Sequence, residues 1–219
     1  MSEVTIQIGG NKLGATLDLP RDARGVVVFA HGSGSSRFSP RNRQVATALQ
    51  AAGLGTLLMD LLTEAEDRID AETSEFRFNI PLLASRLVGA TNWLRARNDT
   101  RDFSVGYFGA STGAAAALSA AAEKPDDIDA VVSRGGRPDL ANAALAKVKA
   151  PTLLLVGSLD RVVIDFNRAA IDHMKCEKSM ELIPGATHLF EEPGALEQVA
   201  KRATEWFRRH LVRDRHNAA

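Results

Sequence analysis

The sequence contains a single cysteine, Cys176, among its 219 residues, and this scarcity excludes an internal disulfide. A chain of this length buries most of its apolar surface as one domain and needs no covalent staple. We expect one domain over residues 1–212 and a polar, disordered tail over residues 213–219. The lack of disulfides suits a reducing compartment, so we expect a cytoplasmic protein.

The sequence also lacks an excess of either charge, since 27 Lys and Arg residues balance 27 Asp and Glu residues. A general nucleic-acid-binding protein carries a basic excess, so we expect no nucleic-acid partner. No apolar run approaches the length of a membrane span, and the N-terminal residues do not form a signal peptide. We therefore expect a small-molecule partner and no membrane partner, with the oligomeric state, monomer or homodimer, left open.

Short apolar runs alternate with helical patterns along the chain. Val4–Ile8 and Ala15–Leu19 alternate apolar and polar residues around a Gly-Gly turn, which predicts an antiparallel hairpin. Six further runs are expected to be strands: 25–30, 56–60, 104–108, 128–133, 152–156 and 180–183. Helical patterns lie between them, whereas the acidic residues 61–79 show no clear period. The pattern predicts an α/β fold with a doubly wound, mostly parallel eight-stranded sheet, an antiparallel N-terminal edge and no large cap domain.

The stretch from Val105 to Leu118 carries the strongest functional signal. Gly109–Gly113 reads Gly-Ala-Ser-Thr-Gly, between a β-rich run and an Ala-rich helix former. This is the strand-turn-helix setting of a nucleophile elbow, in which Ser111 is held at a strained backbone conformation. The alternative is a chance Gly-x-Ser-x-Gly in a chain rich in Gly and Ala. The setting favours Ser111 as a nucleophile.

Asp160 and His188 follow later predicted strands, so we expect them at the same edge of the sheet as Ser111. The order Ser111, Asp160, His188 is the nucleophile, acid and base order of α/β-hydrolases. A serine hydroxyl needs a base to remove its proton, and a carboxylate fixes the tautomer of that base. The alternatives are that Asp160 caps the next helix and that His188 is an ordinary loop histidine. Asp165, at the predicted helix start, is the better candidate for a cap.

The glycine-rich loop that begins at His31 follows the first buried strand. We expect the backbone N–H of Thr112 and that of Ser33, with Gly34 next, to form an oxyanion hole. His31 is a candidate substrate contact. The competing interpretation is a phosphate cradle, but the loop lacks the third glycine of a dinucleotide fingerprint.

Two arginines, Arg134 and Arg137, follow another predicted strand. A guanidinium there can bind a substrate carboxylate or phosphate, or it can pair with Asp60 or the acidic residues 64–67, and the sequence leaves both open. The arginines at 37, 41 and 43 are expected to be solvated or to pair with loops.

These motifs resemble the α/β-hydrolase superfamily and, within it, the small dienelactone hydrolase-like proteins. The resemblance runs from about Gly25 to Leu211 and implies an α/β-hydrolase fold with Ser111 as nucleophile, Asp160 as acid and His188 as base. The chain departs from true dienelactone hydrolases in carrying serine where they carry cysteine. The resemblance therefore implies a serine hydrolase of small carboxylic esters without implying dienelactone as substrate.

We expect no metal and no organic cofactor. Hydrolysis of a thioester or small amide by the same triad is the nearest alternative. A non-catalytic, hydrolase-like binding protein is an alternative from a different class.

Overall fold

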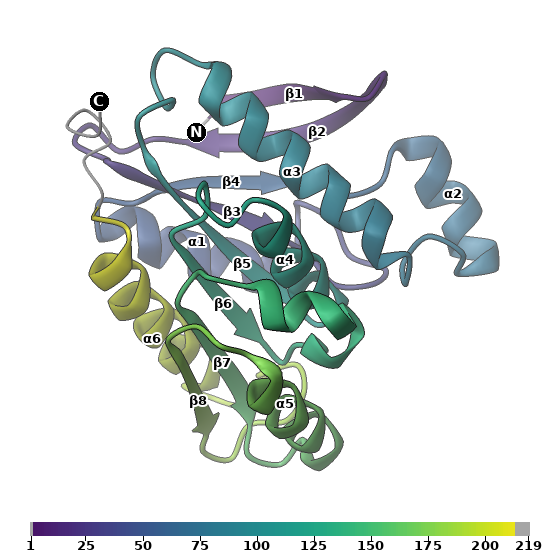
Figure 1. Cartoon of the computed structure of the whole chain (residues 1–219), viewed down its shortest axis with the longest axis vertical. Coiled ribbons are helices and arrows are strands. Elements are labelled where there is room, and N and C mark those ends of the chain that lie inside the picture. Colours follow the sequence, from purple (N-terminus) through teal and green to yellow (C-terminus); the bar gives the residue numbers. More distant parts are fainter. Residues whose placement is uncertain (1, 213–219) are drawn as a thin grey trace.

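The computed structural model describes residues 2–212, which form an eight-stranded sheet of order β1-β2-β4-β3-β5-β6-β7-β8 (Figure 1). β1 pairs with β2 and β2 with β4 in antiparallel fashion, and the remaining neighbours are parallel. The predicted sheet and its antiparallel edge are confirmed, and residues 2–212 include no separate cap. The expected tail lies outside the described residues. The strands are β1 (Ser2–Ile8), β2 (Asn11–Asp18), β3 (Gly25–Ala30), β4 (Gly55–Met59), β5 (Ser104–Ala110), β6 (Ala130–Arg134), β7 (Thr152–Gly157) and β8 (Lys178–Ile183).

Helices cover both faces of the sheet, which is why the central strands β3 to β7 are buried along their whole length (Figure 1). One face packs against α1 (Pro40–Ala51) and α6 (Ala195–His210). The other packs against α3 (Ile80–Ala96), α4 (Thr112–Glu123), the 3₁₀ segment η1 (Pro138–Lys147) and α5 (Arg161–His173). Within residues 2–212, no helix is long and apolar enough to cross a membrane.

The stretch 61–79, expected to be irregular, contains the helix α2 (Glu64–Thr73), so this expectation was wrong. A capping box begins the helix: Glu66 N–H donates to Thr63 Oγ1 at 3.2 Å, and Thr63 N–H donates to Glu66 Oε2 at 2.7 Å. Asp70 is the one buried residue of α2, which explains the missing apolar stripe. Local capping rather than a core-facing pattern defines this helix.

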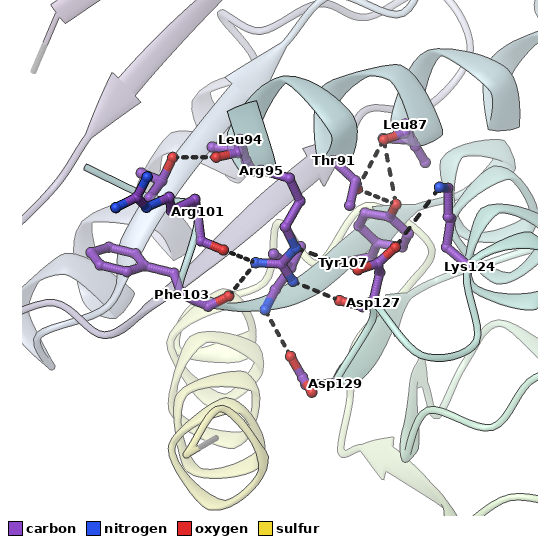
Figure 2. A network of polar contacts seen from close by, with 12 residues as sticks. Leu87, Thr91, Leu94, Arg95, Arg101, Phe103, Tyr107, Lys124, Asp127 and Asp129 are labelled. Carbon is purple, nitrogen blue, oxygen red and sulfur yellow. Dashed lines mark hydrogen bonds and ion pairs between the residues drawn. The ribbon is translucent and has the colours of Figure 1, made fainter. Parts of the chain in front are cut away.

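The amino ends of the parallel strands are fixed by a polar network around Arg95, at the end of α3 (Figure 2). Its Nη1 donates to the carbonyl oxygens of Arg101 and Phe103, at 3.1 and 2.6 Å, and its Nη2 donates to that of Asp127 at 3.1 Å. The network joins α3, the start of β5 and the turn before β6. It therefore anchors the end of the sheet opposite the candidate site, with no catalytic side chain involved.

Candidate active site

Ser111 occupies a sharp turn between β5 and α4, with φ of 52° and ψ of −122°. Such a conformation is unfavourable for a residue with a side chain and is found where surrounding structure enforces it. The close packing appears at the flanking glycines. A Cβ on Gly113 would lie 2.3 Å from the Ala30 oxygen, and one on Gly109 would lie 2.5 Å from Ala114 Cα. The backbone therefore has the geometry expected of a nucleophile elbow.

Asp160 and His188 meet through their side chains, with Asp160 Oδ2 2.7 Å from His188 Nδ1. Asp160 follows β7 and precedes α5, whereas His188 lies after β8. The Asp160 side chain is 14% exposed and the His188 side chain 41%, so the carboxylate is screened while the imidazole reaches the surface. An Nδ1–H that donates to Asp160 leaves Nε2 free of its proton, as a general base requires.

The loop after β6 contacts both Ser111 and His188. The Ser111 N–H donates to the Arg134 oxygen at 3.2 Å, and the Arg137 N–H donates to the Ser111 oxygen at 3.1 Å. A Cβ on Gly135 would lie 3.7 Å from His188 Cε1. This loop brings the elbow and the imidazole together at the carboxyl ends of the parallel strands, where such sheets place their sites.

The glycine-rich loop after β3 lies against the elbow. Ser33 Oγ and Thr112 Oγ1 are 3.0 Å apart, within hydrogen-bonding distance. A Cβ on Gly32 would lie 3.1 Å from Ser111 Cβ, and Gly34 has a φ of 66°, which glycine adopts without strain. The backbone N–H of Thr112 lies at the N-terminus of α4, where developing negative charge is favoured. The loop and the helix thus supply polar backbone beside Ser111.

His31 uses both ring nitrogens within the fold. Its Nε2 accepts a hydrogen bond from the Leu61 N–H at 3.1 Å, and its Nδ1 is 2.9 Å from the Gly32 oxygen. These partners require a neutral ring with the proton on Nδ1. Burial lowers the pKa of His31 and outweighs the opposing effect of the Gly32 hydrogen bond. The geometry favours a structural role for His31, which links its own glycine-rich loop to Leu61 in the loop after β4, over contact with substrate.

The two arginines after β6 differ in their partners. Arg137 pairs with Asp139 through two hydrogen bonds of 2.9 and 2.7 Å, and its guanidinium lies 4.2 Å from the centre of the Phe166 ring. Asp60, one expected partner of Arg134, is instead bonded to Arg37, whose backbone N–H lies 2.8 Å from Asp60 Oδ1. The geometry thus favours a structural role for Arg137, in which it holds its own loop, over binding of a substrate anion. Arg134, by contrast, is buried at the end of β6.

The other arginines near this edge pair with loops or pack on a ring. Arg41 pairs with Glu191 at 3.0 Å, and the guanidinium of Arg43 lies over the Phe38 ring. A cavity of about 360 Å³ opens beside this group, between the loops after β3 and β4. Its lining combines polar and apolar groups and contains none of Ser111, Asp160 and His188; the polar members include Lys12, Ser35, Ser36, Arg37, Asp60, Glu64 and Asp67. Asp60 and Arg37 were not singled out as a pair from the sequence, because their separation of 23 positions gives no local signal.

The chain is similar along nearly its whole length to proteins of one family. Residues 13–212 match the dienelactone hydrolase family. A crystal structure of a dienelactone hydrolase from Anabaena variabilis is 58% identical, with a TM-score of 0.94, and the match covers 96% of this chain and 97% of that one. The esterase Est1E from Butyrivibrio proteoclasticus is 17% identical, with a TM-score of 0.81 over 97% of this chain and 100% of that one, and shares the fold.

Two relatives from Mycobacterium tuberculosis carry a different name. Each is called "Putative phosphoribosyl transferase" and is 54% identical over 209 residues, which cover 95% of this chain. The same match covers 46% of each relative, so this chain spans about half of their length. Their name describes proteins about twice as long as this chain, so it does not alter the family assignment. That assignment rests on the family match over residues 13–212 and on the similar fold of the Anabaena structure. The chain belongs to the dienelactone hydrolase family and has the α/β-hydrolase fold.

Proposed function

We propose that the chain is a serine hydrolase that cleaves small carboxylic esters through an acyl-enzyme on Ser111. The observation that supports this most strongly is the 2.7 Å contact between Asp160 and His188, at the same edge of the sheet as the strained Ser111. The carboxylate of Asp160 orients the ring through one nitrogen, and the other side of the ring is exposed, which is the arrangement that a general base for a serine uses. The family and its esterase neighbours support the same reaction class.

In the proposed mechanism, His188 Nε2 takes the proton of Ser111 Oγ as the Oγ–C bond forms. The carbonyl π electrons move onto oxygen, and the N–H groups of Thr112 and Ser33 stabilise this oxyanion. Asp160 holds the imidazolium through Nδ1–H. The oxyanion then collapses, the bond to the alcohol oxygen breaks, and the imidazolium protonates the leaving alcohol. Water repeats the sequence in the second half-reaction and releases the acid, which restores Ser111.

Turnover of p-nitrophenyl acetate, combined with fluorophosphonate labelling, tests this proposal. We expect hydrolysis, and a single adduct that mass spectrometry locates on the Ser111 peptide. Ser111→Ala should lose roughly 10³ to 10⁶ of kcat, because oxyanion and binding contributions alone remain. An adduct on another serine, with Ser111→Ala still active, would overturn the assignment. Failure of the wild type to turn over esters, thioesters or small amides would favour a binding protein.

The name of the mycobacterial relatives suggests phosphoribosyl transfer as a second candidate. The matched part is under half of those proteins, so the remaining half can carry that activity. For this chain we favour hydrolysis, because the elbow and the Asp160–His188 pair serve acyl transfer. We expect this chain to release no pyrophosphate from phosphoribosyl diphosphate under conditions in which it hydrolyses esters rapidly.

A further inference from the structure

Arg134 is a buried guanidinium whose hydrogen-bonding capacity the fold leaves unused. The residue is 9% exposed and ends β6. Among residues 2–212, none accepts a hydrogen bond from its Nε or Nη1. Burial, and then the nearby charge of Arg41, lowers the pKa of Arg134 to about 10, so it stays charged at neutral pH. Buried charges are ordinarily paired, so an unpaired guanidinium here indicates a missing partner.

The N-terminus of α1 adds positive potential on the same side of the sheet. Along β6, Arg134 shares a face with Val132, which packs in the core beneath α1 and α6. The first turn of α1 contains no acidic residue and instead contains Arg41; Pro40 has no N–H, and the Asn42 N–H already donates to Ser39 Oγ at 3.3 Å, so the helix contributes its dipole more than free N–H groups. A helix N-terminus favours anions and disfavours cations. Arg41, Arg134 and the helix dipole therefore repel one another unless an anion lies among them.

Glu191 is the anion that the chain itself offers, and it is weakly held. Its Oε1 lies 3.0 Å from Arg41 Nη1, but its side chain is 64% exposed, and exposed ion pairs contribute little to stability. The preceding residue, Phe190, lies under Arg134, with 5.9 Å between the guanidinium carbon and the ring centre. Its φ of 57° is strained for a bulky side chain. The exposed ion pair of Arg41 with Glu191 is thus the contact that an incoming anion would displace.

We propose that Arg134 and Arg41, beside the positive end of the α1 dipole, bind the phosphate group of the substrate, so that the enzyme acts on small phosphorylated carboxylic esters. This rests on the proposed hydrolase function and deepens it. The Arg134 oxygen accepts the Ser111 N–H, and Gly135 lies against His188, so the anion would bind beside the acyl centre. Two guanidinium groups and a helix N-terminus match a dianion with three acceptor oxygens better than a carboxylate.

Calorimetry with inorganic phosphate on the Ser111→Ala protein, at constant ionic strength, tests the site without catalysis. We expect phosphate to bind more tightly than succinate. Arg134→Met should weaken phosphate binding by about tenfold or more, as expected for loss of charge-assisted hydrogen bonds. Glu191→Gln should strengthen it, because a competing carboxylate is removed. Arg137→Met is the matched comparison and should leave it unchanged, since Arg137 is paired with Asp139.

The outcomes separate the possibilities. Equal phosphate binding by wild type and Arg134→Met, or no binding at 10 mM as a rough upper limit, overturns the site. Tighter binding of succinate through Arg134 overturns phosphate in favour of a carboxylate. If Arg134→Met fails to fold, two other variants test the site. Arg134→Lys should weaken phosphate binding, and Glu191→Gln should strengthen it. If neither variant changes phosphate binding, the proposal is overturned.

A matched pair of esters links the site to turnover. We expect kcat/KM for the acetate ester of glycerol 3-phosphate to exceed that for glycerol monoacetate by about tenfold or more, with Arg134→Met removing the difference. Equal turnover of both esters overturns the phosphate site and leaves the hydrolase standing. Phosphate binding through Arg134 without turnover of either ester overturns the hydrolase and leaves the anion site standing.

Discussion

Asp160 occupies the N-cap position of α5 but makes no capping hydrogen bond, and its Oδ2 instead lies 2.7 Å from His188 Nδ1. A carboxylate at this position ordinarily accepts from the first N–H groups of its helix, with a contribution of about 1 kcal/mol. The Asp160 carboxylate therefore does not stabilise its own helix in this way and instead contacts the imidazole of a residue 28 positions later in the sequence. The geometry therefore favours a site residue at 160 over the capping alternative.

The two aspartates near the start of α5 provide a matched pair of variants. Asp160→Asn should lower kcat severely, by up to about 10⁴, because the amide no longer fixes the imidazole tautomer. Asp165→Asn should change kcat little, because Asp165 lies within the helix and pairs with Arg168 at 3.6 Å on the surface. Steady-state kinetics on p-nitrophenyl acetate check this, with circular dichroism as the folding control. The reverse ranking would transfer the acid role to Asp165.

A double variant tests whether Ser111 and His188 act as one unit. His188→Ala should lower kcat about as much as Ser111→Ala, and combining the two should lower it little further, because neither half works without the other. Single-turnover measurements of both single variants and the double variant check this. If the kcat loss of the double variant equalled the product of the two single losses, His188 would contribute independently of Ser111.

The buried His31 predicts a pH dependence of stability. Its folded-state pKa is lowered by burial, so the unfolded chain takes up a proton first as the pH falls. Its contribution is therefore full above the unfolded pKa of about 6.5 and is lost as the pH falls toward the folded pKa. Urea midpoints from pH 8 to 5 should fall more steeply for the wild type than for His31→Asn. Parallel curves would contradict a buried, neutral His31.

The acidic start of α2 and the lack of a separate cap within residues 2–212 predict short acyl substrates. The first turn of α2 carries Glu64, Glu66 and Asp67, so it offers a poor surface for a long acyl chain or a lipid interface. We expect p-nitrophenyl acetate or butyrate to exceed octanoate in kcat/KM, with no increase on micelles. A jump in rate above the critical micelle concentration, or a preference for octanoate, would reveal an acyl channel that this geometry lacks.

The buried strands were predictable because each is dominated by a short apolar run, and β3 spans the predicted residues 25–30 without correction. The elbow was predictable because its sequence, glycines included, is local. α2 was missed because its single buried residue is Asp70, although its capping pair, Thr63 and Glu66, is visible in the sequence. Asp165 was wrong as a cap because α5 begins one turn earlier, at Arg161.

Long-range pairing was the part that the sequence left open. Nothing local indicates that Arg37 pairs with Asp60, which lies 23 positions away, and this pairing leaves Arg134 without that acid. The expected roles of Thr112, Ser33 and Gly34 depend on where two backbone segments meet. That arrangement follows from sheet order, which no single segment encodes.

The positive φ of Ser111 implies that the elbow is a place where the fold has not been selected for maximal stability. Conformations of this kind cost of order 1–3 kcal/mol for a residue with a side chain, and glycine adopts them freely. Replacement of Ser111, the proposed nucleophile, by glycine is therefore expected to raise the melting temperature and to abolish turnover. A screen of this chain for thermostability alone would tend to discard its chemistry, so selection for turnover must oppose the drift toward a more stable but inert protein.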